Sequence, residues 1–306
     1  MKQDSKIGLA LAGGGARGGA HIGVLQVLHE NHISINLIAG TSAGAIIGAM
    51  YAATLDPEWV EKRYMEYMES DEFRAVGIHH VRKGKDGNDS FLEQLGKFVK
   101  DKLVITVALS RKGVIERSKL AATIEYLLPV RDFSELKIPL KVIVSDLNRA
   151  EAVVISSGDL IAAVTLSSAV PGFVAPLAED GRLLVDGGVV SPLPINTLLD
   201  SEMDITIAVD IARRKLDTLE EYNLIELMSR VDQVTSVKLS DELSRKADVL
   251  IEPDVGGAHW SEFSRIDEFI KNGRESAQRA LPLLKREIEE RERWSYHFRR
   301  WIKSRI

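Results

Sequence analysis

The most constraining stretch of this sequence is LALAGGGARGGAHIG, Leu9–Gly23, which has five glycines within the seven positions from Gly13 to Gly19. An apolar run typical of a buried strand precedes the glycines, and an apolar pattern typical of a helix follows them. Backbone N–H groups in such a unit converge on one place, and the helix N-terminus adds a positive dipole there. The stretch therefore predicts a loop that holds negative charge.

Two nucleotide-binding motifs share features with this loop. Gly13, Gly15 and Gly18 spell G-x-G-x-x-G, but a dinucleotide fold also needs an acidic residue roughly 20 positions later, after the second strand. The second apolar run, Ile35–Ala39, is instead followed by GTSAG. A P-loop would need Gly-Lys-Ser or Gly-Lys-Thr to close the loop, and the sequence lacks it. Neither nucleotide-binding motif is complete.

The segment GTSAG, Gly40–Gly44, follows a strand pattern and opens an apolar helix pattern. In a nucleophile elbow, a serine sits on a strained strand-to-helix turn, and small neighbours let the two elements approach. We expect Ser42 to be the nucleophile and Gly40 and Gly44 to permit the turn. The alternative is a small-residue turn in a buried α/β crossing. Together with the N–H donors of the glycine loop, the segment favours an oxyanion site for acyl transfer.

Arg17 interrupts the glycines at the start of the predicted helix. A cation in the first turn opposes the helix dipole, at a cost of a few tenths of a kcal/mol. It is either a solvated surface charge or a residue that orders the glycine loop or attracts an anionic substrate. We favour the second interpretation.

Asp186 and His259 are the candidate bases for Ser42. Asp186 ends the apolar run RLLV and precedes Gly187 and Gly188, a turn that another backbone can approach closely. In isolation, the same residues would also fit an Asp-Gly hairpin turn. His259, in the loop VGGAHW, has the chain position that a Ser–acid–His triad requires. The residues favour Asp186 and leave a triad open.

Four blocks of the sequence, in this order, resemble the bacterial patatin-like phospholipase family. They are Gly13–Gly18, Gly40–Gly44, Ser167–Phe173 and Asp186–Gly188. The resemblance covers Ile7 to about Ala212. It implies an α/β, three-layer patatin-like fold in which helices cover both faces of a mainly parallel central sheet. We expect a catalytic domain over residues 1–212 and a mostly helical C-terminal extension, residues 213–306, packed on the same domain.

The resemblance also implies the chemistry of a Ser–Asp dyad. Ser42 would be the nucleophile and Asp186 the base, with no cofactor and no metal. The oxyanion and anion-binding loop would comprise Gly13, Gly14, Gly15, Ala16, Arg17 and Gly18, and the turn glycines would be Gly40, Gly44, Gly187 and Gly188. The implied substrates are phospholipids, lysophospholipids or other acyl esters. A solvated aspartate, with a pKa near ~3.9, is a poor base, so the dyad requires dry surroundings for Asp186.

Two other functions remain open on the sequence alone. One is a Ser–His esterase or acyltransferase that uses His259. The other is a catalytically silent lipid-binding or regulatory module that keeps the fold. The presence of both Ser42 and Asp186 argues against the silent module.

The composition limits the binding partners and the cellular compartment that we expect for this protein. The chain has 306 residues, 45% of them hydrophobic, a net charge of −5 and no cysteine. It therefore has no general attraction to nucleic acid and forms no disulfide. The first apolar run, Ile7–Ala12, is shorter than the roughly 7–15 residues of a secretory signal. The uncharged stretch Leu37–Leu55 is long enough for a membrane span, but a buried strand, turn and helix explain it better. We expect a cytoplasmic protein.

The segment Arg291–Ile306 differs from the rest of the chain. It contains six Lys or Arg residues and one Glu, together with Trp294 and Trp301. On a helix, Trp294, Phe298 and Trp301 share one face. Such a helix either packs its aromatic residues on the protein core or lies on an anionic membrane. The second alternative predicts peripheral contact with the inner membrane surface.

The remaining chain alternates strand and helix patterns, which favours a mainly parallel sheet. Asp56-Pro57-Glu58 has the residues of a helix start and predicts a helix to about Met68. A long helix is expected over Leu219–Leu243. Further strands are expected at Leu140–Val144, Val153–Ile155, Ile205–Val209 and Val249–Ile251.

Overall fold

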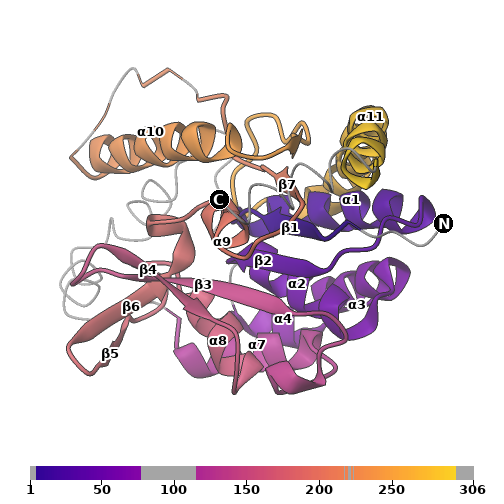
Figure 1. Cartoon of the computed structure of the whole chain (residues 1–306). Coiled ribbons are helices and arrows are strands. Elements are labelled where there is room, and N and C mark those ends of the chain that lie inside the picture. Colours follow the sequence, from indigo (N-terminus) through magenta and orange to yellow (C-terminus); the bar gives the residue numbers. More distant parts are fainter. Residues whose placement is uncertain (1–4, 77–114, 217, 220–221, 223, 294–306) are drawn as a thin grey trace.

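The computed structural model describes residues 5–76, 115–216, 218–219, 222 and 224–293 (Figure 1). In this part of the chain, eight strands form one mixed sheet in the order β5-β6-β3-β2-β1-β7-β8, with β4 also paired to β3. The strands are β1 (Ile7–Leu11), β2 (Leu37–Thr41), β3 (Leu140–Asp146), β4 (Glu151–Ile155), β5 (Leu177–Glu179), β6 (Arg182–Asp186), β7 (Ile205–Val209) and β8 (Val249–Ile251).

Strands β3, β2, β1, β7 and β8 are parallel, whereas β4 and β6 run antiparallel to β3. Every residue of β1, β2 and β7 is buried, as expected for central strands covered on both faces. The mainly parallel sheet and the helices around it confirm the predicted fold class.

Helices surround the sheet (Figure 1). They are α1 (Gly19–Glu30), α2 (Ala43–Thr54), α3 (Pro57–Glu69), α4 (Asp71–Val76), α7 (Arg117–Leu127), α8 (Leu160–Ser167), α9 (Ile195–Leu199), α10 (Leu224–Ser244) and α11 (Ile266–Glu292). The chain moves outward in one direction from β1 to β3 and in the other direction from β1 to β8. Right-handed crossovers therefore put α1 and α2 on one face and α10 on the other, where it contacts α9.

The strands predicted from β-pattern residues are all present. Those predicted at Ile205–Val209 and Val249–Ile251 have the bounds of β7 and β8, and the other two lie within β3 and β4. Asp56 caps α3 as expected, because its carboxylate accepts the N–H groups of Glu58 at 3.1 Å and Trp59 at 3.0 Å. The long helix predicted from Leu219 is α10, which begins at Leu224.

The last third of the chain is built into the same sheet and core. β8 extends the sheet beside β7, and α11 packs along α1. The two helices approach so closely that a Cβ added at Gly23 would overlap the carbonyl oxygen of Ile270, and one added at Gly273 would overlap that of Ala20. A domain boundary near residue 212 stays a prediction.

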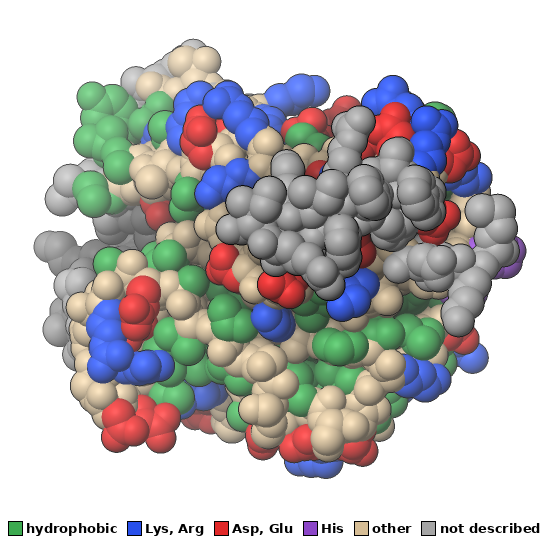
Figure 2. All heavy atoms as spheres, in the orientation of Figure 1, with side chains coloured by type: hydrophobic (Ala, Val, Ile, Leu, Met, Phe, Trp, Pro, Cys, Tyr) green, Lys and Arg blue, Asp and Glu red, His purple; other side chains and the backbone are tan. Residues whose placement is uncertain are grey.

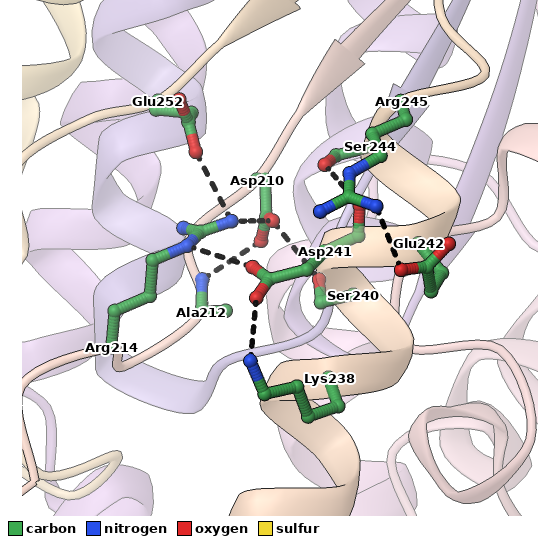
Figure 3. A network of polar contacts seen from close by, with 10 residues as sticks. All are labelled: Asp210, Ala212, Arg214, Lys238, Ser240, Asp241, Glu242, Ser244, Arg245 and Glu252. Carbon is green, nitrogen blue, oxygen red and sulfur yellow. Dashed lines mark hydrogen bonds and ion pairs between the residues drawn. The ribbon is translucent and has the colours of Figure 1, made fainter.

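A buried polar network fastens α10 to the end of β7 (Figure 3). Asp210 is only 1% exposed, and its carboxylate accepts the N–H of Ala212 at 2.9 Å and the hydroxyl of Ser240 at 3.0 Å. Arg214 pairs with Asp210 at 2.6 Å and with Asp241 at 3.1 Å. A buried charge with this many partners holds α10 against the sheet edge.

The surface of α10 carries exposed hydrophobic side chains, which Figure 2 shows gathered at the upper left. They include Met228, Val231 and Val234. In the described part of the chain, no helix is long and apolar enough to cross a membrane. The predicted amphipathic segment is described only at its first residues, where Arg291 bonds the Asp204 carbonyl and Asp248. Residues 294–306 lie outside the described residues, so membrane contact there stays a prediction.

The crossing of α1 and α11 gives a stability prediction. Gly23→Ala and Gly273→Ala should each lower the free energy of unfolding by roughly 1–3 kcal/mol, because the added methyl overpacks a backbone contact. Gly257→Ala is the control, since the nearest atoms to an added Cβ there lie 3.7 and 4.0 Å away. Thermal and denaturant unfolding measure the difference. If all three variants melt like the wild type, the helices do not pack this closely.

Candidate active site

Ser42 lies on the turn between β2 and α2. Its backbone has φ 52° and ψ −120°, a strained conformation that a non-glycine residue adopts rarely. Ser42 is the N-cap of α2, yet its side chain makes no capping bond to the helix. Gly44 lets this turn fit, because a Cβ there would overlap the carbonyl oxygen of Leu11 at the end of β1. The geometry matches the strand–turn–helix setting expected for a nucleophile elbow.

Asp186 ends β6 and reaches the serine turn. A hydrogen bond joins its carboxylate to the Ser42 side chain, and a second, of 2.7 Å, comes from the N–H of Gly188. The residue is 5% exposed. Burial raises the pKa of Asp186 to about 6, although both hydrogen bonds act to lower it. The dry surroundings that a Ser–Asp pair needs are therefore present.

The segment Ser167–Phe173 binds the backbones of both Ser42 and Asp186. The Ser167 hydroxyl accepts the backbone N–H of Ser42 at 2.9 Å and donates to the carbonyl of Ile143 at 2.6 Å. The carbonyl of Ala169 accepts the N–H of Asp186 at 3.0 Å. The sequence marked this segment by resemblance without indicating its role; here it braces the backbones of both residues.

The glycine loop lies directly beside Ser42. A Cβ added at Gly13 would lie 3.3 Å from the Cβ of Ser42. The Gly13 N–H already donates to the carbonyl of Pro192 at 2.9 Å, in the chain that follows Asp186. In contrast, the N–H groups of Gly14 and Gly15 make no hydrogen bond to any residue that the structure describes. These two N–H groups are therefore the candidate oxyanion donors of the loop.

The side chain of Arg17 binds the backbone of the glycine loop. Its Nε donates to the Gly14 carbonyl at 3.2 Å and its Nη1 to the Ala258 carbonyl at 3.5 Å. Burial lowers the pKa of Arg17 to about 10, and nearby Arg213 acts in the same direction. In a trans peptide the C=O and the next N–H point in opposite directions. By binding the Gly14 carbonyl, Arg17 therefore fixes the direction of the Gly15 N–H.

His21 is a site residue that the sequence motifs did not indicate. It is fully buried on α1, and its Nε2 lies 2.8 Å from the Ala12 carbonyl oxygen, at the start of the glycine loop. Burial lowers the pKa of His21 to about 4, although the Ala12 contact and Asp210 act to raise it. The ring is therefore neutral at pH 7 and donates through Nε2. No sequence pattern indicated this contact.

The loop that carries His259 packs against the other side of the glycine loop. The carbonyl of Trp260 accepts the N–H of Ala16 at 2.7 Å. Gly15 has φ 58°, and a Cβ there would overlap the same carbonyl oxygen. His259 itself is buried, and its Nδ1 lies 2.8 Å from the hydroxyl of Ser261. This region lies beyond the four blocks that resemble the family, yet it packs directly against the glycine loop.

The remaining glycines of the predicted site also lie at close contacts. Gly18 packs on Ala43 at the start of α2, where an added Cβ would lie 2.7 Å from the alanine methyl. A Cβ added at Gly40 would lie 2.6 Å from the carbonyl oxygen of Gly44, and one at Gly187 would overlap that of Ile143. Among the described residues, no group of three or more His, Cys, Asp or Glu side chains is placed to hold a metal ion.

Comparisons with known proteins identify relatives of this chain. The sequence profile of the family described as patatin-like phospholipase matches residues 9–199. An uncharacterised NTE family protein of Mycobacterium tuberculosis is 32% identical over 206 residues, which are 67% of this chain and 49% of that protein. A patatin-like phospholipase domain-containing protein of Caenorhabditis elegans is 30% identical over 222 residues, 72% of this chain and 14% of that protein. The chain thus spans about half the length of the mycobacterial relative.

A solved structure shares the fold. VipD from Legionella pneumophila has a TM-score of 0.50 and 16% sequence identity, and the alignment covers 91% of this chain and 67% of that one. At this identity the similarity concerns the fold alone. The family profile, however, covers more than half of the chain, from β1 to the end of α9, and includes every block that carried the resemblance. This chain belongs to the patatin-like phospholipase family.

Proposed function

We propose that this protein is a serine acyl-ester hydrolase of the phospholipase A or lysophospholipase type, acting through a Ser42–Asp186 dyad. One observation carries the proposal: the side chain of Ser42, on a strained turn, is hydrogen-bonded to the buried carboxylate of Asp186. Membership of a family described as patatin-like phospholipase supports a lipid ester as substrate. The relatives are much longer proteins, so the proposal concerns the chemistry of this site.

The first half-reaction forms an acyl-enzyme. Asp186 accepts the proton of the Ser42 hydroxyl while the oxygen attacks the ester carbonyl carbon, giving a tetrahedral intermediate with a negative oxygen. The N–H groups of Gly14 and Gly15 stabilise that oxyanion. When the intermediate collapses, the bond to the alcohol breaks, and the alcohol leaves with the proton from Asp186. An acyl ester of Ser42 remains.

The second half-reaction releases the acid. Asp186, again ionised, takes a proton from a water molecule, which attacks the acyl carbon. The second intermediate expels Ser42, and the proton on Asp186 returns to the serine oxygen. One ester bond and one water are consumed, and a carboxylic acid and an alcohol are formed. His259, fixed by a contact within its own loop, has no part in either step.

Arg17 and His21 act on the donors rather than on the substrate. Arg17 binds the carbonyl of Gly14, and His21 binds that of Ala12, so the Gly14–Gly15 and Ala12–Gly13 peptide planes are fixed before substrate arrives. Donors that are already oriented need no reorganisation as charge develops. We propose both as positioning residues for the oxyanion loop.

The dyad is tested by activity on short-chain acyl esters and on phospholipid and lysophospholipid. Ser42→Ala and Asp186→Asn should each remove turnover, because one lacks the nucleophile and the other lacks the base. His259→Ala is the matched comparison and should keep most of the activity. Circular dichroism shows that each variant is folded. If His259→Ala is as inactive as Ser42→Ala, a triad replaces the dyad; if the wild type cleaves no ester, the proposal is wrong.

The buried carboxylate also predicts a stability change with pH. The pKa of Asp186 is about 6 in the folded state and ~3.9 when unfolded, so the folded state binds the proton more tightly and loses stability as pH rises between these values. Asp186→Asn removes that loss and should stabilise the protein at pH 7 by on the order of 3 kcal/mol. The gain should vanish below about pH 4. Asp180→Asn, on an exposed turn, is the control in the same thermal unfolding series.

The glycine loop predicts a defect in turnover. Gly15→Ala places a methyl group against the Trp260 carbonyl at a φ that alanine rarely adopts, so it should misdirect the Gly15 N–H. Loss of one oxyanion donor lowers kcat roughly 10²–10³-fold. The KM for a short ester should change little, since the ground-state substrate carries no full charge. A Gly15→Ala enzyme with wild-type kcat would exclude this N–H as a donor.

A further inference from the structure

The segment Gly187–Ser191, which we call the Asp186 turn, follows Asp186 and closes on itself. The carbonyl of Gly187 accepts the N–H groups of Val190 at 3.3 Å and Ser191 at 2.8 Å. The segment is therefore a short bonded unit that is joined directly to the carboxylate-bearing residue. Because of this connection, the place of the Asp186 carboxylate depends on how the turn is held against the rest of the fold.

The hydroxyl of Thr41 ties the Asp186 turn to the end of β2. Thr41 is fully buried, and its Oγ1 donates to the carbonyl of Ser191 at 2.9 Å. Among the described residues, no other group makes a hydrogen bond to that carbonyl. Thr41 also immediately precedes Ser42 in the chain. A single hydrogen bond thus connects the backbone beside the proposed nucleophile to the last residue of the turn that follows the proposed base.

The hydroxyl of Ser145 ties the same turn to β3. Ser145 is fully buried, and its Oγ donates to the carbonyl of Gly187 at 3.1 Å and accepts the N–H of Val190 at 3.2 Å. In a trans peptide the C=O and the following N–H point in opposite directions, so a bond to the Gly187 carbonyl directs the N–H of Gly188. That N–H donates to the Asp186 carboxylate at 2.7 Å. Ser145 therefore helps to aim a hydrogen bond that Asp186 receives.

The ends of β2 and β3 lie directly against the Asp186 turn. The two strands are parallel neighbours, with Thr41 paired to Ile143. A Cβ added at Gly187 would overlap the carbonyl oxygen of Ile143 and would lie 3.2 Å from the Cγ2 of Thr41. Valine has nearly the shape of threonine, so packing alone does not require a hydroxyl at Thr41. The hydroxyls of Thr41 and Ser145 have in common that both bond this one turn.

We infer that Thr41 and Ser145 are positioning residues that hold the carboxylate of Asp186 against the serine hydroxyl. The inference rests on the dyad proposed above. The Ser42 turn is strained, with φ 52°, and such a conformation persists only where neighbouring groups hold it. A misplacement of about 1 Å between reacting groups can lower a rate roughly 100-fold. Two hydroxyls that take no part in bond making therefore control how fast the pair reacts.

Thr41→Val and Thr41→Ser separate the hydroxyl from the shape of the side chain. The valine variant keeps the branched shape and loses the bond to Ser191, whereas the serine variant keeps the hydroxyl. With a short-chain p-nitrophenyl ester, Thr41→Val should lower kcat roughly tenfold or more, because the reacting groups lose their alignment. The KM should stay within about twofold of the wild-type value, since the lost interaction aligns the dyad and does not bind substrate. Thr41→Ser should keep most of the wild-type kcat.

Thr206→Val is the matched control for the loss of a buried hydroxyl. Thr206 is 2% exposed on β7, and its Oγ1 donates to the carboxylate of Asp248 at 2.8 Å. It pairs with Gly8 near the start of β1, away from the strand ends that carry the candidate site. The same substitution there should lower the melting temperature and leave kcat unchanged.

The position of the carboxylate is also measurable without catalysis, through the pKa of Asp186. Its hydrogen bonds to Ser42 and Gly188 lower that pKa against the effect of burial, and no charged group acts on it. A turn released by Thr41→Val or Ser145→Ala weakens these bonds, so the pKa should rise above about 6. NMR shifts of the side-chain carboxyl carbons, followed against pH and assigned with Asp186→Asn, give the value. An unchanged or lower pKa in both variants overturns the inference.

The two measurements keep the positioning role separate from the proposed function. If the wild type hydrolyses no ester, the proposed function fails, yet the pKa comparison still decides whether the hydroxyls hold Asp186. If Thr41→Val and Thr206→Val lower kcat by the same factor, the loss follows from destabilisation and the inference is wrong. It is also wrong if Thr41→Val keeps the wild-type kcat while Ser42→Ala and Asp186→Asn are inactive, a result that leaves the dyad intact.

Discussion

The candidate site exists because α2 begins directly against the end of β1. Gly44 leaves no room for a side chain beneath the carbonyl of Leu11, so the serine turn after β2 and the glycine loop after β1 share one edge of the sheet. Ser42 is lifted from the backbone by the strain of that turn. A larger residue at Gly44 would separate the two loops, and the proposed nucleophile would then lie away from the proposed oxyanion donors.

Two buried aspartates show how surroundings divide their roles. Asp210 follows β7 and is surrounded by donors from Ala212, Ser240 and Arg214, so its charge is matched and holds α10 in place. Asp186 ends β6 and contacts the N–H of Gly188 and the hydroxyl of Ser42, and no cation acts on its pKa. The ionised form of Asp186 is therefore less stable in the folded protein, which suits its proposed role as the group that accepts a proton. The same residue type stabilises the fold at Asp210 and is the proposed base at Asp186.

Sequence patterns predicted the strands and turns, which depend on residues that are close together in the chain. Periodicity located β7 and β8, and the short motifs predicted the turns that carry Ser42 and Asp186. The motifs did not show that the Gly13 N–H is occupied by Pro192, or that His21 holds the Ala12 carbonyl. The first contact depends on how distant backbones cross, and the second depends on how α1 lies over the end of β1. No side-chain pattern in the sequence records either contact. The contact of Trp260 could not be predicted either, because its backbone carbonyl makes the bond to the glycine loop and every residue has such a carbonyl.

The order of the chain has a consequence for synthesis. β1 and its glycine loop emerge early from the ribosome, but β7, α11 and the carbonyl of Trp260, which surround them, emerge much later. Until then the central strand lacks one neighbour and the loop lacks the bond to Ala16. A nascent chain therefore carries Ser42 long before the glycine loop beside it is held in place. The arrangement links the ordering of the candidate site to the completion of the fold, and a chain interrupted before Trp260 would lack the bond that holds Ala16.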